Sequence, residues 1–413
     1  MNLDWPWLAI VVLAIPAGLG HLCHMILAVN IVSGTGHREA VLIRARFILF
    51  SAFWISSALM LWGHLHSPWW TWAWPLWGYA ALCTFSGLVV WPISTLAMAL
   101  RHRPEGISPD APVRELDLAG PGGRDELIGE GPRAWLLRLP GNESFRLRLR
   151  EWDVAIPGLP APLDGLRIVQ LTDLHMARCF RPAFFERVVD ACRGWEADLL
   201  VLTGDIIEDD EVVAWIEPLL APLEARLAKY AILGNHDEDH GPSAILDELA
   251  RAGFETLEGS WTSLDADGAT IAIGGTSAPW GPDVDPAAMP EADFRILLSH
   301  SPDRFYRAEK WGIDLMLSGH NHGGQIRLPV VGAVFMPSVY SRRFDRGFFR
   351  RGRTLMYASD GVAGMDPVRY GCPPEITRFV LRPAAYPIEL RESDGLTVRA
   401  RNRPAREWDR VQG

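Results

Sequence analysis

Residues 165–175 read GLRIVQLTDLH, an apolar run that ends in Asp173-Leu174-His175. Leu166–Leu171 has the length and composition of a buried strand, and the two ligand-type side chains follow it at once. The arrangement recurs at Gly204-Asp205, at Gly234-Asn235-His236-Asp237, at His300 and at Gly319-His320-Asn321-His322. Because sites in such sheets form outside the carboxyl ends of the strands, we expect all these segments to converge on one crevice.

Strand-like runs alternate with helical segments from residue 166 onward. The predicted strands are Leu166–Leu171, Leu199–Thr203, Tyr230–Leu233, Thr270–Gly274, Phe294–Ser299 and Asp314–Leu317. The predicted helices are Pro182–Trp195, Glu211–Arg226 and Pro242–Ala252. Further strands are expected at Gln325–Leu328, Val331–Met336, Gly347–Phe349, Leu355–Ala358 and Glu375–Leu381. This pattern predicts an α/β domain in which a second sheet packs on the first, giving a two-sheet β-sandwich flanked by helices.

The ligand types predict a metal site. Carboxylate and imidazole together suit Mn, Fe, Zn or Co better than Ca, and the absence of a thiolate argues against a structural zinc site. Asp205 is the natural bridge, because one carboxylate can face two ions. The set is close to that of two adjacent divalent metals, with one histidine to spare for proton transfer. Such a centre indicates hydrolysis, most often by attack of water on phosphorus.

Each segment alone has a simpler explanation. An isolated Asp-x-His is more often a turn carboxylate beside a surface histidine, and His300 alone would more often be a core histidine. Gly234-Asn235-His236-Asp237 alone is also a good turn sequence. The prediction therefore depends on all five segments occurring in this order, each directly after an apolar run.

The first hundred residues differ in kind from the rest. They carry ten of the eighteen tryptophans and a net charge of +1, which leaves −11 for the remainder. Three stretches, Leu8–Val32, Phe47–Trp62 and Trp69–Leu100, approach or exceed the ~20 apolar residues needed to span a bilayer. The lipid bilayer is therefore an expected partner. The acidic remainder argues against nucleic-acid binding.

Arginines predict the orientation of these spans. They gather in the first connection and after the third span, at Arg38, Arg44, Arg46, Arg101 and Arg103. The positive-inside rule then puts the N-terminus outside and the large C-terminal part in the cytoplasm. His21 and His24 share a helix face and are either a metal, haem or proton site or, as we favour, a pair hydrogen-bonded to a neighbouring helix.

Composition divides the chain into four parts. We expect a transmembrane region with three helices at residues 1–102 and a catalytic domain at residues 146–390. Residues 103–145 are rich in Pro, Gly and charge without periodicity, and this predicts a flexible linker. Residues 391–413 are predicted to be a C-terminal tail.

The order Asp-x-His, Gly-Asp, Gly-Asn-His-Asp, His and Gly-His-x-His resembles the calcineurin-like metallophosphoesterase superfamily, over roughly residues 150–385. The longer stretches AILGNHD, SGHNHGGQIRLP and VRYGCPPEIT resemble its bacterial membrane-anchored branch. That branch includes pyrophosphatases of lipid A biosynthesis that act on UDP-2,3-diacylglucosamine. The resemblance implies a metallophosphoesterase fold. It also implies an integral protein of the bacterial cytoplasmic membrane.

The resemblance also implies roles for individual residues. One divalent metal would be held by Asp173, His175 and His322, a second by Asn235, His300 and His320, and both by Asp205. His236 would act on the leaving oxygen. The acid that supports His236 would be Glu208, at a position where many relatives have Asp. The alternative is Asp237, the residue next to His236. Arg178 and Arg369 are candidates for binding further phosphate oxygens, although each is more simply a surface or structural arginine.

We therefore expect a membrane-anchored enzyme that hydrolyses a phosphate ester or diphosphate bond with metal-activated hydroxide. A lipid-linked substrate such as UDP-2,3-diacylglucosamine fits the three spans. The alternatives are a tethered phosphodiesterase that acts on soluble substrates and a non-catalytic metal-binding membrane scaffold. The sequence leaves the oligomeric state and the identity of the metal open.

Overall fold

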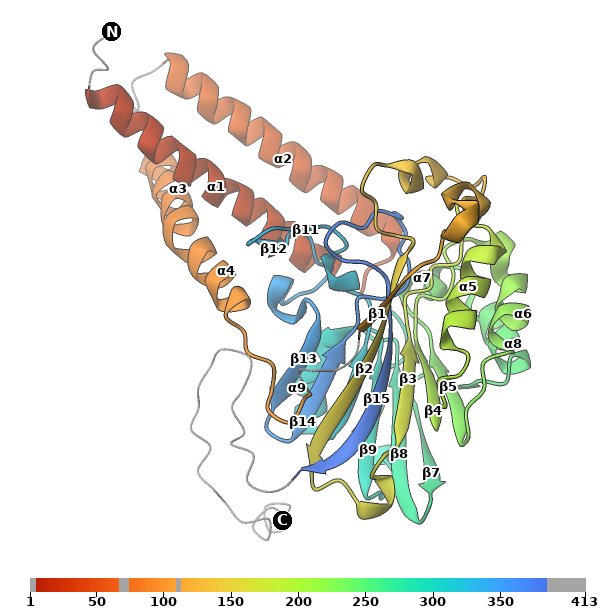
Figure 1. The fold of residues 1–413 in the computed structure, drawn as a ribbon. Coiled ribbons are helices and arrows are strands. Elements are labelled where there is room, and N and C mark those ends of the chain that lie inside the picture. Colours follow the sequence, from red (N-terminus) through yellow and green to blue (C-terminus); the bar gives the residue numbers. More distant parts are fainter. Residues whose placement is uncertain (1–4, 67–73, 109–112, 385–413) are drawn as a thin grey trace.

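The computed structural model describes residues 5–66, 74–108 and 113–384 of the chain. Figure 1 shows a domain of two packed sheets with helices outside them, from which a bundle of long helices projects. The predicted C-terminal tail, residues 391–413, lies outside the described residues, as does the end of the predicted domain after residue 384.

The projecting bundle contains the described parts of the predicted apolar stretches; residues 69–73 of the third stretch lie outside the described residues. Its helices are α1 (Trp5–Ser33), α2 (Glu39–His66), α3 (Trp74–Phe85) and α4 (Trp91–Ala99), the last two joined by a π-helical turn at Ser86–Val90. Three segments, Ile15–Ser33, Ala40–Leu59 and Gly78–Ala99, are long and apolar enough to cross a membrane. The second is longer than the predicted Phe47–Trp62, because α2 begins at Glu39 and the apolar segment starts at Ala40.

The first sheet has seven strands in the order β1-β2-β15-β3-β4-β5-β6. Their bounds are β1 (Val113–Asp117), β2 (Arg146–Pro157), β15 (Glu375–Ala384), β3 (Arg167–Leu171), β4 (Leu199–Thr203), β5 (Ala228–Ile232) and β6 (Glu255–Thr256). Strands β3 to β6 are parallel, and β15 runs antiparallel to β3. The carboxyl ends of β3, β4 and β5 therefore meet at one edge.

The second sheet has six strands in the order β13-β14-β10-β9-β8-β7. Their bounds are β13 (Gly347–Arg351), β14 (Thr354–Ala358), β10 (Leu315–Ser318), β9 (Phe294–Ser299), β8 (Ala269–Thr276) and β7 (Ser260–Ala266). A small hairpin, β11 (Arg327–Leu328) with β12 (Gly332–Ala333), lies apart. The second sheet thus begins with β7 at Ser260 and ends with β14, whereas β15, the last strand of the chain, belongs to the first sheet.

Alternate residues of each strand enter different cores, because successive side chains point to opposite faces. Ile168 of β3 packs between the two sheets, while its neighbour Val169 packs under the outer helices. Those helices are α5 (Pro182–Cys192), α6 (Ile216–Leu220) and α8 (Pro242–Arg251), and α9 (Phe305–Lys310) covers the second sheet. The domain is thus a sandwich of two sheets between helical layers, as predicted.

The predicted helix Glu211–Arg226 is shorter in the structure. A 3-10 segment, Asp210–Trp215, leads into α6, which ends at Leu220. Pro222 follows two residues later and has no N–H with which to continue the helical hydrogen bonds. The helix-like spacing of residues therefore continues to Arg226, although α6 ends at Leu220.

The described part of residues 103–145 is folded onto the domain, which corrects the predicted flexible linker. Strand β1 extends the first sheet, and short 3-10 segments follow at Gly120–Gly122, Arg124–Glu126 and Ala134–Arg138. Leu127 and Leu137 are fully buried in the core under the outer helices. Proline and glycine interrupt any regular period here, but irregular backbone can still bury its apolar side chains.

The helical bundle is attached directly to the domain. At the end of α4, Arg101 Nη1 donates to Asp345 Oδ1 over 2.7 Å, and its guanidinium lies 4.3 Å from the centre of the Phe349 ring. Near the end of α1, the buried Asn30 donates from Nδ2 to the Ser341 hydroxyl over 2.9 Å. These contacts position the domain at the ends of α1 and α4 that lie away from the N-terminus (Figure 1).

Candidate metal centre

Ligand-type side chains from both sheets meet at the carboxyl ends of their strands. Asp173 and His175 follow β3, Asp205 follows β4, and His300 follows β9. Asn235 follows β5 at the start of the short helix α7 (Asn235–Asp239). His320 and His322 follow β10. The structure thus brings together all seven residues that the sequence placed around metal ions.

One group consists of Asp173, His175, Asp205 and His322, whose ligand atoms lie within 4.8 Å of one another. His175 Nε2 is 3.3 Å from His322 Nε2 and 3.3 Å from Asp205 Oδ2. His322 Nε2 is 3.6 Å from Asp173 Oδ1. Two imidazole nitrogens and two carboxylates therefore point at one small volume.

A second group consists of Asp205, His300 and His320, and again the ligand atoms lie within 4.8 Å of one another. His300 Nε2 is 3.3 Å from Asp205 Oδ2 and 3.2 Å from His320 Nδ1. The amide oxygen of Asn235 is 3.2 Å from the same His300 nitrogen. Asp205 Oδ2 is therefore shared by the two groups.

The protonation of these side chains fits a cation. Burial and neighbouring positive charge lower the pKa of His320 to about 3 and that of His322 well below its usual value. Neutral His322 donates from Nδ1 to the Ala363 carbonyl, and neutral His320 donates from Nε2 to the Pro337 carbonyl. Each therefore turns the lone pair of its other nitrogen into the cluster, which is the form that binds metal.

Asp205 makes the same cluster attractive to positive charge. Burial disfavours the imidazolium form, yet Asp205, together with Glu208 at His175 and Asp173 at His300, outweighs burial and raises the pKa of His175 to about 10 and that of His300 to about 9. Among the described residues, the buried Asp205 Oδ2 has no hydrogen bond of good geometry, and its neighbours His175 Nε2 and His300 Nε2 each lie 3.3 Å away. A buried carboxylate oxygen without a good hydrogen bond, between converging nitrogens, is the environment that a divalent ion satisfies.

The backbone of the cluster is strained. Asp173, His175, Asp205, His320 and His322 all have φ between 40° and 65°, in the left-handed region that non-glycine residues rarely adopt. Such conformations cost on the order of 1–3 kcal/mol each and cluster at functional sites. The strain indicates that the loops are shaped to aim these side chains rather than to minimise local energy.

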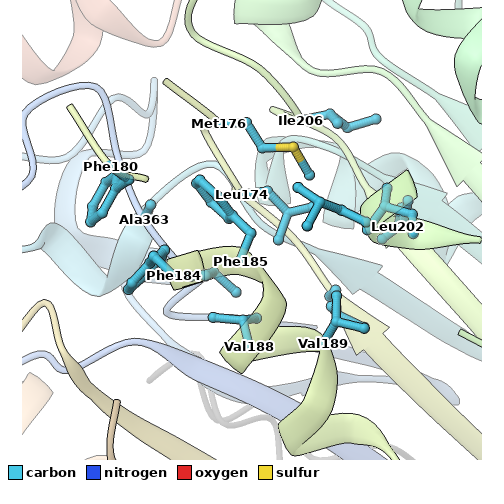
Figure 2. Packing of buried hydrophobic residues seen from close by; sticks show 14 of the residues in the cluster. Leu174, Met176, Phe180, Phe184, Phe185, Val188, Val189, Leu202, Ile206 and Ala363 are labelled. Atoms are coloured by element: carbon cyan, nitrogen blue, oxygen red, sulfur yellow. The ribbon is translucent and has the colours of Figure 1, made fainter. Parts of the chain in front are cut away.

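The packing of Leu174 and Met176 fixes the directions in which Asp173 and His175 point. Leu174 and Met176, which flank His175 in sequence, are buried in the core beneath α5. Figure 2 shows them near Phe185 and Ile206, among the apolar side chains of that core. Asp173 and His175 alternate with these two residues, and their side chains therefore enter the metal cluster.

Adjacent glycines make room for the ligands. A Cβ on Gly234 would lie 2.1 Å from Asp205 Oδ1, and a Cβ on Gly319 would lie 2.4 Å from Asp173 Oδ2. Neither position can accept a side chain without moving a carboxylate of the cluster. The glycines that precede Asn235 and His320 are therefore required by the close approach of ligand side chains.

His236 lies beside the cluster and is held by Glu208. Its Nδ1 is 2.8 Å from Glu208 Oε2, and the same oxygen is 2.9 Å from His175 Nδ1. Burial disfavours a charged His236, but Asp205 and Glu208 outweigh burial and raise its pKa. Burial also opposes ionisation of Glu208, but the hydrogen bonds from His175 and His236 outweigh it and lower the pKa of Glu208 to about 2.

Asp237, the other acid proposed beside His236, has a different contact set. Its carboxylate accepts hydrogen bonds from the backbone N–H groups of Ile206, Ile207 and Gly234 at 2.8–3.1 Å. It thereby ties the loop after β4 to the loop after β5. The structure corrects the sequence-based alternative: Glu208, not Asp237, contacts the His236 ring.

The two candidate phosphate-binding arginines are engaged elsewhere. Arg178 pairs with Asp209 at 2.5 Å and Glu211 at 2.9 Å. The buried Arg369 donates to the carbonyls of Asp360, Cys372 and Ala363. Arg369 therefore holds the loop before β15 in shape, and this geometry favours the structural interpretation of both arginines.

The histidine pair of α1 is also accounted for by neighbouring helices. His21 Nδ1 is 2.6 Å from the Tyr79 hydroxyl, and His24 Nε2 is 2.9 Å from the Ser86 hydroxyl. Within the described ranges, neither histidine belongs to a group of metal-type ligands. These contacts are the hydrogen bonds to neighbouring helices that we favoured for His21 and His24.

Comparison with known proteins agrees with this geometry. The family model described as "Calcineurin-like phosphoesterase" matches residues 166–324. The uncharacterized metallophosphoesterase YkuE of Bacillus subtilis is 34% identical over 235 residues, covering 54% of this chain and 82% of YkuE. The chain belongs to the calcineurin-like phosphoesterase family. The prediction of a metal-dependent phosphoric ester hydrolase with this fold is confirmed.

Two further relatives carry names that describe activities. Phosphodiesterase YaeI of Escherichia coli is 31% identical over 223 residues, which cover 52% of this chain and 82% of YaeI. The UDP-2,3-diacylglucosamine pyrophosphatase LpxG of Chlamydia trachomatis is 27% identical over 294 residues, which cover 56% of this chain and 88% of LpxG. The family thus includes relatives named for diester and for diphosphate hydrolysis.

Two contacts of the cluster were not found from the sequence. The ring of Trp280 lies 4.6 Å from that of His320, and the Pro337 carbonyl accepts a hydrogen bond from His320 Nε2 over 2.8 Å. Trp280 occupies a loop between predicted strands, and a backbone carbonyl has no residue-type signal. Only the fold reveals that these groups orient the His320 ring.

Proposed function

We propose that the protein is a membrane-anchored dinuclear-metal phosphoesterase or pyrophosphatase that acts on a lipid-linked phosphate. The observation that carries the proposal is one loop, residues 334–341, that contacts both the metal cluster and a membrane-type helix. UDP-2,3-diacylglucosamine is the first substrate to test, because the relative LpxG is named for it. Its acyl chains would lie in the bilayer beside the helices, and its diphosphate would be at the membrane surface.

The shared loop joins ligand and helix through short hydrogen bonds. The Pro337 carbonyl accepts from His320, and the preceding Met336 N–H donates to Asn30 Oδ1 over 2.9 Å. Asn30 Nδ2 in turn donates to the Val334 carbonyl over 3.2 Å. Because Asn30 belongs to α1, the metal cluster is positioned next to the end of an apolar helix.

The arrangement of charges supports the cytoplasmic leaflet. The N-terminus of α1 and the domain lie at opposite ends of the bundle (Figure 1). If these helices span the bilayer, the arginines of the first connection and of the α4 end lie on the domain side. The positive-inside rule assigns that side to the cytoplasm.

The donor sets divide between two ions in the proposed centre. The first ion would be held by Asp173, His175 and His322, the second by Asn235, His300 and His320, and both by Asp205. Two divalent ions in such a cluster supply Lewis-acid activation of water near neutral pH and neutralise charge on phosphoryl oxygens. The shared position of Asp205 Oδ2 supports its role as the bridge.

His236 is the proposed proton donor to the leaving oxygen. Its Nδ1 is occupied by Glu208, which leaves Nε2 for the substrate. The charges of Glu208 and Asp205 favour the imidazolium, and the proton is therefore available at neutral pH. A positioned acid of this kind contributes roughly 10²–10⁴-fold to the rate.

The proposal is tested with the purified full-length protein in detergent and Mn²⁺. We expect hydrolysis of UDP-2,3-diacylglucosamine to UMP and the lipid phosphate, measured by mass spectrometry. Asp205→Asn should abolish turnover, whereas Asp247→Asn, a matched change on the exposed face of α8, should preserve it. Turnover of simple diesters without turnover of this lipid would reject the lipid substrate but keep the hydrolase.

The name of the relative YaeI favours a second candidate, a tethered phosphodiesterase with soluble substrates. The two candidates differ in whether acyl chains matter. A lipid-directed enzyme should lose kcat/KM when the acyl chains of the substrate are shortened, whereas an enzyme for soluble diesters should not.

A further inference from the structure

A pocket of about 1060 Å³ lies between the helical bundle and the domain. Its walls are mostly apolar and come from α1, at Ile26 and Leu27, and from the π-turn and α4, at Val90 and Met98. The domain closes it with residues of the segment 334–349. The pocket therefore combines the surface of two membrane-type helices with the polar edge of a folded domain.

Positive charge gathers at the domain side of this pocket. Among the described residues that line it, the arginines are Arg101, Arg103, Arg342 and Arg343, and the one carboxylate is Glu105. Arg101 is neutralised by Asp345. Positive charge beside an apolar groove matches the chemistry of an amphipathic anion, and Arg342 is the arginine that carries the argument.

Arg342 has the environment of a cation that lacks its counter-ion. Within the described ranges its hydrogen-bond acceptors are neutral: the carbonyls of Val331 and Ala333 and the hydroxyls of Ser94 and Thr95, at 3.2–3.3 Å. The nearby Asp345 accepts instead from Arg101 and Arg327. Burial lowers the pKa of the Arg342 guanidinium, which an anion would reverse.

We propose that this pocket binds one anionic phospholipid of the membrane, with its phosphate on Arg342 and its acyl chains along α1 and α4. Guanidinium groups match phosphate oxygens in geometry, and basic pockets between membrane helices on the cytoplasmic side bind anionic head groups. The pocket lies at the arginine-bearing end of α4, where head groups would be. The inference depends on the proposed insertion of the helices in the bilayer.

This lipid site is separate from the metal centre but linked to it. None of the seven metal ligands lines the pocket, and neither does His236. Tyr340 and Ser341 do line it, and they continue the loop in which Pro337 contacts His320. The bound lipid is therefore a structural lipid beside the catalytic loop and not the substrate.

The test measures phospholipid binding to the full-length, detergent-purified protein by native mass spectrometry. Phosphatidylglycerol is the anionic probe, and phosphatidylcholine is the zwitterionic control. We expect one phosphatidylglycerol to bind in preference to phosphatidylcholine. Arg342→Gln should weaken its binding about fivefold, the effect of one arginine near a membrane surface. Arg307→Gln, at an exposed arginine of α9 paired with Asp283, should leave it unchanged.

A second variant distinguishes loss of the lipid site from misfolding of the Arg342→Gln protein. Ala97→Trp fills the pocket from α4 without removing a cation, and it should also displace the lipid while the protein retains its bound metal. Inorganic phosphate added at the same concentration should not compete, because it lacks the acyl chains. Equal binding of the two lipids to the wild type, or phosphatidylglycerol binding unchanged in both variants, would overturn the inference.

Failure of this inference is distinguishable from failure of the proposed function. Release of the protein from bacterial membranes by alkaline carbonate would refute membrane insertion and with it both proposals. A protein that stays in the membrane and hydrolyses its substrate, but shows no preference for phosphatidylglycerol, would overturn the lipid site alone.

Discussion

Glu208 Oε2 lies 2.8 Å from His236 Nδ1 and 2.9 Å from His175 Nδ1, and one carboxylate oxygen therefore orients two rings of the centre. The two histidines are also close to each other, with ring centres 4.8 Å apart. A carboxylate that holds a histidine fixes its orientation and favours its protonated form. Glu208 is therefore the residue that couples the proposed proton donor to the metal cluster.

Replacing Glu208 with Gln should shift the pH profile of hydrolysis. A proton donor is active only below its pKa, and activity is lost as the pH rises through that value. The charge of Glu208 contributes to the raised pKa of His236. Glu208→Gln should therefore move the alkaline limb of kcat/KM to lower pH, and Glu208→Asp should move it less. The matched control is Glu211→Gln, an exposed acid that pairs with Arg178.

Removing His236 should separate catalysis from metal binding. We expect His236→Ala to reduce kcat by roughly 10²–10⁴-fold, the usual contribution of a positioned acid. The metal content, measured by plasma mass spectrometry, should remain that of the wild type, since His236 is outside both ligand sets. His240→Ala, at the partly exposed end of α7 and paired with Asp210, is the control. Loss of metal from the His236 variant would contradict the assignment and make it a ligand.

The convergence of the proposed metal ligands could be predicted because their signal is local. Each follows an apolar run that the sequence displays, and parallel strands bring their carboxyl ends together. The contact of Glu208 with two histidines could not be predicted without the fold, because sequence spacing alone left Asp237 as an equal candidate. The contacts of Asn30 and Pro337 with distant segments have no local signal at all.

The predicted linker failed for a different reason. Glycine and proline in residues 103–145 exclude a long helix, but the absence of a long helix does not imply mobility. Leu127, Ile128 and Leu137 are nevertheless buried in the core. They lie in or next to 3-10 turns that are too short to show a repeating pattern in the sequence. The predicted flexible linker is therefore replaced by a folded segment, and the helices contact the domain directly.

The packed segment can be tested by stability. Leu137→Ala removes a fully buried side chain and should lower the free energy of unfolding of the domain by about 2–5 kcal/mol. Trp135→Ala, only two residues earlier but 64% exposed, should change it by less than about 0.5 kcal/mol. Thermal or urea unfolding followed by circular dichroism measures both. Equal stability of the two variants would restore the flexible-linker interpretation.

Asn30 offers a test of the connection between the helices and the metal centre. Asn30→Ala removes the acceptor of the Met336 N–H and the donor to the Val334 carbonyl, leaving buried polar groups unpaired at a cost of about 1–3 kcal/mol. The loop should then hold the Pro337 carbonyl less firmly against His320. Loss of such outer contacts typically weakens metal binding 10–100-fold, and we expect about tenfold for this indirect change.

Calorimetric titration of metal-free, full-length protein with Mn²⁺ would measure that effect of Asn30→Ala. Thr35→Ala is the matched control, because the partners of the Thr35 hydroxyl among the described residues are Val32 and His37, near the end of α1. The control should bind Mn²⁺ as the wild type does. If Asn30→Ala also bound Mn²⁺ with wild-type affinity, the loop would not transmit the position of α1 to His320. The helices would then be a passive anchor, and the placement of the metal centre would depend on the two sheets alone.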